Sequence, residues 1–76
     1  MQNHGKDFDY TRYAGAIEET LDRLAARNGT VDTRQIYLET SVPKDLIIEV
    51  LDREMVEFPE RIHKIVDHEE GREWKR

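Results

Sequence analysis

The stretch Asp32–Leu51, DTRQIYLETSVPKDLIIEVL, contains the signals for two helices joined by a tight turn. Asp32 can cap a helix N-terminus, and Gln35 follows it at capping-box spacing. The break at 40–43 ends in Pro43, which suits the first turn of a new helix because the missing amide hydrogen has no partner there. Apolar residues then recur at helical spacing, namely Leu46, Ile47, Val50 and Leu51. The stretch predicts helices at about residues 33–40 and 43–55.

Upstream of this stretch, a longer helix is predicted at about residues 10–28. Its apolar residues recur every three or four positions, at Tyr10, Ala14, Ile17, Leu21, Leu24 and Ala25. Asp9 is the predicted N-cap, and Asn28-Gly29 is a strong helix stop. Thr30-Val31 can form a short β step before the next helix. Residues 1–9 lack periodicity and are expected to be a flexible tail.

Downstream, residues 59–76 fit two alternatives. In the first, a β-hairpin has strands near 61–67 and 72–76, with Gly71 in its turn and Trp74 in its second strand. In the second, a fourth helix spans about 59–70, with Pro59 at its first position, and makes the chain all-α. The adjacent pair Ile65-Val66 breaks strand alternation and favours the helix, whereas the turn residues and Trp74 favour the hairpin.

The chain is small and acidic. Its 76 residues are enough for a single domain, expected at residues 10–76. The formal net charge is −5, and it is uneven: residues 1–60 carry 7 Lys and Arg against 13 Asp and Glu, whereas residues 61–76 carry 5 against 4. Cysteine is absent and the apolar runs are short, so we expect a cytoplasmic protein with no membrane partner.

Residues that could carry chemistry form no recognisable constellation. His4, His63 and His68 match no metal-ligand spacing, and the sequence has no Gly-rich phosphate loop. Ser41 and the histidines show no arrangement of nucleophile, base and orienting group. The sequence therefore predicts a protein that is not an enzyme and that uses no metal or cofactor.

The order of predicted elements resembles that of a winged helix–turn–helix domain over residues 10–76. The resemblance lies in residues 29–33, 36–42, 50–54 and 62–74. It implies an α+β, mainly α fold, with a three-helix core and a C-terminal β-hairpin wing. One departure is that Arg53-Glu54 is followed by Met55-Val56, where many members of the family place a glycine after the third helix.

The resemblance also implies nucleic-acid binding and a role in transcription regulation. In DNA-binding members the third helix enters the major groove and the wing touches the backbone, so Ser41, Lys44, Ile48, Glu49, Asp52 and Arg53 would face the groove. A homodimer would add avidity. The residues predicted to bind duplex DNA are Lys44 and Arg53 on this helix, with Arg61, Lys64, Arg72, Lys75 and Arg76 in a basic wing.

Charge favours an alternative. The third helix has only Lys44 and Arg53 as cations against four carboxylates, and negative charge beside a polyanion opposes binding. An apolar strip edged by acids suits a protein partner better. The alternative is therefore an acidic protein–protein interaction module in a larger assembly, with Ile48, Glu49 and Asp52 contacting the partner. We expect DNA binding only because it is the commonest use of this fold.

Overall fold

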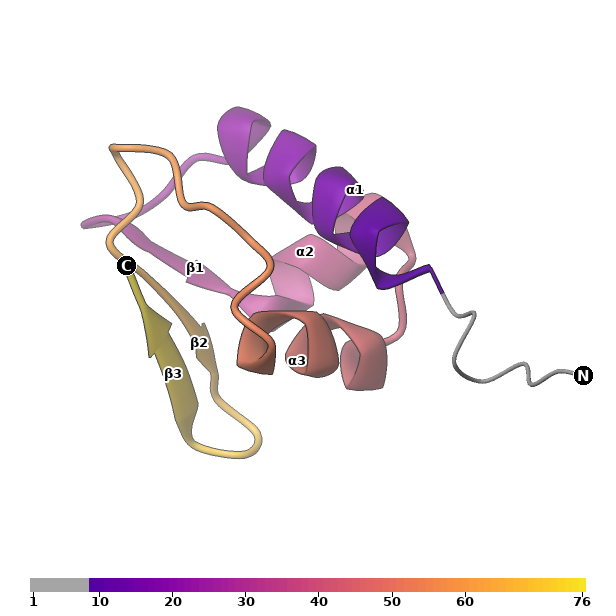
Figure 1. Cartoon of the computed structure of the whole chain (residues 1–76). Coiled ribbons are helices and arrows are strands. Elements are labelled where there is room, and N and C mark those ends of the chain that lie inside the picture. The colour runs from indigo at the N-terminus through magenta and orange to yellow at the C-terminus, as the bar shows by residue number, and fades with distance from the viewer. Residues whose placement is uncertain (1–8) are drawn as a thin grey trace, which may run out of the picture.

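The computed structural model describes residues 9–76, so the predicted tail lies outside the described residues except for Asp9. Three helices and three strands follow one another along the chain: α1 (Tyr10–Arg23), β1 (Thr30–Asp32), α2 (Thr33–Thr40), α3 (Lys44–Asp52), β2 (Lys64–Asp67) and β3 (Arg72–Lys75). The fold is α+β and mainly helical, a helix–turn–helix core with a C-terminal hairpin, residues 64–75, that we call the wing (Figure 1). The alternative of a fourth helix over 59–70 is wrong.

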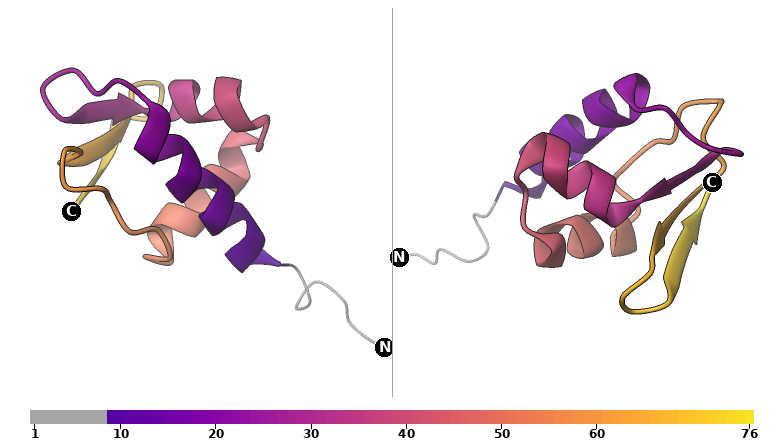
Figure 2. Two further views of the ribbon diagram at one scale, coloured as in Figure 1. Left: turned by 90° about the horizontal axis from the view of Figure 1, so that it is seen from above. Right: turned by 180° about the vertical axis from the view of Figure 1, so that it is seen from behind.

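The sheet is mixed, and the helix–turn–helix is its crossover. β1 pairs with β2 in parallel, and β2 pairs with β3 antiparallel. Parallel neighbours need a long connection, and here it consists of α2, α3 and the segment 53–63. The helices gather on one side of the sheet, and the loop that closes the wing projects beyond them (Figures 1 and 2).

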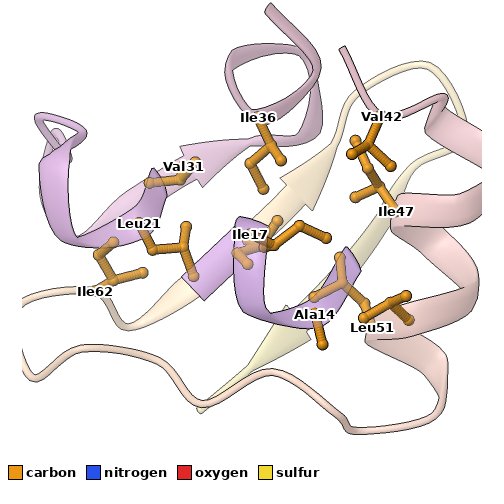
Figure 3. Close-up of a cluster of buried hydrophobic side chains, with 11 residues drawn as sticks. Ala14, Ile17, Leu21, Val31, Ile36, Val42, Ile47, Leu51 and Ile62 are labelled. Atoms are coloured by element: carbon orange, nitrogen blue, oxygen red, sulfur yellow. The ribbon is translucent and has the colours of Figure 1, made fainter. Parts of the chain in front are cut away.

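One hydrophobic core joins the two layers. Ile17 and Leu21 of α1 point toward side chains from α2, α3 and the sheet (Figure 3). The sheet alternates, so Val31 and Ile65 face this core while their neighbours face outward. The buried apolar side chains are Ala14, Ile17, Leu21, Val31, Ile36, Val42, Ile47, Val50, Leu51, Ile62 and Ile65.

The first helix ends earlier than predicted. It stops at Arg23 instead of residue 28, because Leu24 takes an extended conformation. Asn28 and Gly29 both have positive φ, 54° and 74°, and Thr30 N donates to Arg27 O at 3.0 Å. Asn-Gly with positive φ at both positions is the pattern of a type I′ hairpin turn. The prediction that Asn28-Gly29 terminates the helix was therefore wrong, since the pair forms a separate turn into β1.

The helix–turn–helix follows the sequence closely. The predicted capping box is confirmed, with Gln35 Oε1 accepting from Asp32 N at 2.9 Å and Asp32 Oδ1 accepting from Arg34 N at 2.8 Å. Asp9 also caps α1 as predicted, accepting from Arg12 N at 3.1 Å. Ser41 closes α2 in the left-handed conformation, with φ 61°.

The third helix runs over 44–52, not 43–55, with Pro43 as its N-cap. Glu54 is left-handed, with φ 58°. Its N–H donates to Leu51 O at 3.0 Å, and Met55 N–H donates to Val50 O at 3.2 Å. These two bonds are those of a Schellman motif, which normally places glycine at the left-handed position. Glu54 therefore occupies the place of the glycine that the sequence lacks.

Replacing Glu54 with glycine is expected to stabilise the protein by about 0.5–1 kcal/mol, because a left-handed conformation strains an L-residue and not glycine. The free energy of unfolding measured by urea titration checks this. Glu57→Gly is the matched control: Glu57 is exposed in the same connection and its φ is not positive. A Glu54→Gly protein no more stable than the control would contradict the expectation.

The first strand of the wing begins at Lys64, three residues later than predicted. Ile62 N–H donates to Pro59 O at 2.9 Å in a turn, and His63 and Lys64 then donate to Gly29 O at 2.7 and 3.1 Å. The strand therefore starts where β1 becomes available as a partner. Ile62 is buried without belonging to the sheet.

Candidate interaction surface

Lys44 at the start of α3 is held by acidic side chains of residues 67–71, the tip of the wing. Its Nζ lies 3.3 Å from Asp67 Oδ2 and 4.0 Å from Glu70 Oε2, and it forms a short hydrogen bond to Glu69. The bond to Glu69 is the main cause of a raised Lys44 pKa, with Asp67 adding to it and burial opposing it. Lys44 was predicted to face DNA, but carboxylates already surround its charge.

Asp52 at the end of α3 makes a second connection to the wing. Its Oδ1 accepts from Arg72 Nη2 at 2.5 Å and from Trp74 Nε1 at 2.9 Å. The guanidinium of Arg72 also lies over the Trp74 ring, 4.8 Å from its centroid. Hydrogen bonding by Arg72, and then by Trp74, lowers the pKa of Asp52. The hydrogen bond to Asp52 in turn raises the pKa of Arg72. The wing is thus tied to both ends of α3.

This connection predicts a pH dependence. The folded-state pKa of Asp52 lies below its ordinary 3.8, so its contribution to stability is present above that value and is lost as pH falls through the folded pKa. Between about pH 5 and about pH 3, urea midpoints of the wild type should therefore fall more steeply than those of Asp52→Asn, which cannot titrate. Fluorescence of Trp74, the single tryptophan, reports the midpoints. Parallel pH profiles for the two proteins would contradict this.

Arg53 and Glu49 neutralise each other on the outer face of α3. Arg53 Nε donates to Glu49 Oε2 at 2.7 Å, and this bond is the main cause of a raised Arg53 pKa. The guanidinium also lies 4.2 Å from the ring centroid of Tyr10. Ile48, which was predicted with Glu49 and Asp52 to contact a protein partner, is half-buried. Arg53 therefore offers a nucleic acid a charge that is already paired.

Arg61 has a structural role that the sequence did not indicate. Its Nη1 donates to Leu24 O at 2.6 Å, and its Nη2 donates to Leu21 O at 2.9 Å and Asp22 O at 2.5 Å. These carbonyls lie at the C-terminal end of α1, where backbone oxygens lack helical partners. Arg61 thus caps α1 from 37 or more positions away along the chain.

The remaining predicted cations lie at the open end of the wing, away from its closing turn. Lys64 and Lys75 are register partners, and both approach Glu73, at 3.8 and 3.9 Å. Arg76 Nη1 donates to Glu60 O at 2.9 Å. The predicted DNA-binding residues therefore do not form one patch. Some lie at this end, some lie on or against α3, and Arg61 caps α1.

The tip of the wing, residues 67–71, is acidic. Its sequence is Asp-His-Glu-Glu-Gly, and Glu69 and Glu70 are exposed. His68 makes a short contact with the Asp32 carboxylate, and Lys44 is shared among the acids of the tip. A wing that touched DNA phosphates with this tip would bring carboxylates toward them.

Two features of the surface were missed by the sequence predictions. Tyr37 and Leu38 on α2 are 47% and 65% exposed, the only large hydrophobic side chains so exposed among residues 9–76. Leu38 follows the buried Ile36 by two positions, which on a helix points it away from the core. That spacing could have identified it.

The second feature is Asp67, a buried carboxylate that lines the same cavity as Tyr37. Asp67 shares the inner face of β2 with Ile65, as strand alternation would have indicated once the hairpin was chosen. The cavity, of about 410 Å³, lies between the start of α2, Lys44 and the tip. A larger hollow of about 880 Å³ lies between β3 and the segment after α3.

Neither a metal-ion site nor a membrane-spanning helix is found in residues 9–76. No group of three or more His, Asp or Glu side chains there is placed to hold a metal ion. No helix in that range combines the length and apolar character needed to cross a membrane. No protein-family model matches the chain, and comparison with curated proteins and with solved structures finds no significant similarity.

Proposed function

We propose that this protein is an interaction module of winged-helix form that binds a basic surface of another protein. The observation that carries the proposal is the charge of the face formed by α2, the start of α3 and the tip. The acids brought together there are Asp32, Asp67, Glu69 and Glu70, against the cations Arg34 and Lys44. Complementary charge steers partners and sets specificity.

The exposed apolar pair supplies the second component of such an interface. Three exposed residues of α2, namely Arg34, Tyr37 and Leu38, share one side of the helix, and its exposed C-cap Ser41 follows them. Protein interfaces combine aromatic and apolar anchors with a polar rim. We therefore place the partner on this surface, which we call the α2–tip face, in preference to the Ile48–Asp52 side of α3.

The charge of this face also bears on the identity of the partner. A twofold dimer would bring the same patch of both copies together, and two acidic faces would repel. DNA would meet Glu69 and Glu70 at the tip and paired cations on α3, and each uncompensated carboxylate opposes phosphate binding. A basic protein surface fits both the charge and the apolar pair.

The proposal is tested by capturing partners from the source cells with the full chain as bait. Leu38→Asp is expected to lose at least one protein that the wild type retains, and that protein should elute with rising salt. Thr11→Asp is the matched control, because Thr11 is exposed on α1, outside the α2–tip face. Identical partner sets for wild type and Leu38→Asp would refute the proposal.

A second measurement addresses DNA directly. Fluorescence anisotropy with a duplex of mixed sequence at low salt should show no saturable binding by the wild type. The double variant Glu69→Lys with Glu70→Lys should gain measurable, salt-sensitive affinity, since it reverses the charge of the tip. Saturable binding by the wild type that Lys64→Glu with Arg72→Glu abolishes would instead support the DNA-binding alternative.

A further inference from the structure

Asp67 is a buried carboxylate whose hydrogen bonding is incomplete. The residue is 2% exposed, and its Oδ1 accepts from Thr33 Oγ1 at 3.1 Å. Lys44 Nζ lies 3.3 Å from Oδ2, but its hydrogen bond is directed at Oδ1, at 3.4 Å. Oδ2 is buried and receives no hydrogen bond from any residue in 9–76. Lys44 balances the charge of Oδ2 but leaves it without a hydrogen bond, so a donor that displaced Lys44 would find an unused acceptor there.

The cavity beside Asp67 has the walls that a cationic side chain needs. Three carboxylates line it against two Lys or Arg side chains; besides Asp67 the lining residues are Asp32, Thr33, Arg34, Tyr37, Lys44, His68 and Glu69. Tyr37 contributes an aromatic ring and is about half exposed at the rim. A volume of about 410 Å³ accommodates one long side chain and not a folded ligand domain.

Lys44 lies against both oxygens of the Asp67 carboxylate, so an entering cation has to displace it toward Glu69. The short hydrogen bond of Lys44 goes to Glu69, and its contacts with Asp67 are longer. Glu69 is exposed and belongs to the tip, so Lys44 keeps its charge partner when another donor takes Asp67. A metal ion is a poor occupant, since the described residues supply no third ligand.

We infer that this pocket receives an arginine side chain from the basic partner, with its guanidinium paired to Asp67 and stacked on Tyr37. The inference rests on the proposed function and names the residue type that the partner presents. A guanidinium is planar, always charged and able to give two parallel hydrogen bonds to a carboxylate, and it stacks on aromatic rings. Leu38, the residue after Tyr37, then takes an apolar side chain adjacent to that arginine.

The probe is acetyl-leucyl-arginine amide, titrated into the full chain labelled with ¹⁵N and followed by amide chemical shifts. Saturable shifts are expected at Thr33, Tyr37, Lys44 and Asp67. Acetyl-leucyl-citrulline amide has the same shape without the charge, and it should bind at least tenfold more weakly. Equal affinity for the two peptides, or shifts confined to other surfaces, would overturn the inference.

Variants assign the effect to the pocket. Asp67→Asn and Tyr37→Ala should each weaken the arginine peptide at least fivefold, and Glu49→Gln, an acid on the far side of α3, should leave its affinity unchanged. Tyr37 is a surface residue, so its variant remains informative if Asp67→Asn folds poorly. Unchanged affinity in Tyr37→Ala, together with unchanged affinity in a folded Asp67→Asn, would refute the inference.

The partner capture described above separates this inference from the proposed function. A partner lost with Leu38→Asp and retained at full affinity by Tyr37→Ala would leave the interaction module standing and remove the arginine pocket. A partner set unaffected by Leu38→Asp would remove the interaction module itself, whatever the peptide does.

Discussion

Truncating Ile47 to alanine is expected to destabilise the protein by about 3–4 kcal/mol, the largest effect of any single change considered. Ile47 is 0% exposed and joins the buried cluster from α3, beside Val42 (Figure 3). The change removes buried methyl groups and leaves a cavity that close-packed neighbours fill poorly. A small domain has a total stability of only about 5–10 kcal/mol, so a large part of it would be lost. Urea or thermal unfolding measures the change.

The neighbouring residue provides a matched control within the same helix. Ile48→Ala changes the same side chain at the next position, so the helix propensities are equal, but Ile48 is half-buried. Its expected cost is about 1 kcal/mol, in proportion to the smaller apolar area removed from water. Equal losses for the two variants would mean that α3 packs on the core with a different face.

Replacing Arg61 with methionine is expected to cost about 2 kcal/mol, the second largest effect. The change keeps an unbranched apolar stem but removes the donors to the carbonyls of Leu21, Asp22 and Leu24. It also removes a cation from the negative end of the α1 dipole. Amide exchange should therefore accelerate first in the last turn of α1, and the unfolding midpoint should fall.

Two further variants separate geometry from charge. Arg61→Lys keeps the charge but lacks the planar fork, so it should recover less than half of the lost stability. Lys75→Met removes an exposed cation at the open end of the wing and should leave stability nearly unchanged. If Arg61→Met were as stable as Lys75→Met, the capping role would be wrong, and Arg61 would again be available for an external ligand.

The local elements could be predicted because their causes are local. The capping box of Asp32 and Gln35, the break at Pro43 and the apolar spacing through Val50 all act within one turn of helix. Helix ends were less predictable. Asn28-Gly29 ends a helix or makes a hairpin turn by the same left-handed preference, and only the pairing of Arg27 with Thr30 shows which.

The candidate surface could not be predicted to the same degree, because it depends on contacts across the chain. The sequence placed cations on α3 and the wing but could not show that Asp52 holds Arg72, or that Lys44 is held by Glu69. It also could not place Asp67 beside Thr33, 34 positions away.

By itself, then, the sequence determined the helix–turn–helix and its acidic balance, since helix capping, periodicity and net charge are properties of neighbouring residues and of composition. The tertiary structure decided that residues 64–75 form a wing, because β2 needs β1 as a partner. It also decided which charges remain available, because an ion pair depends on the distance between groups that folding brings together.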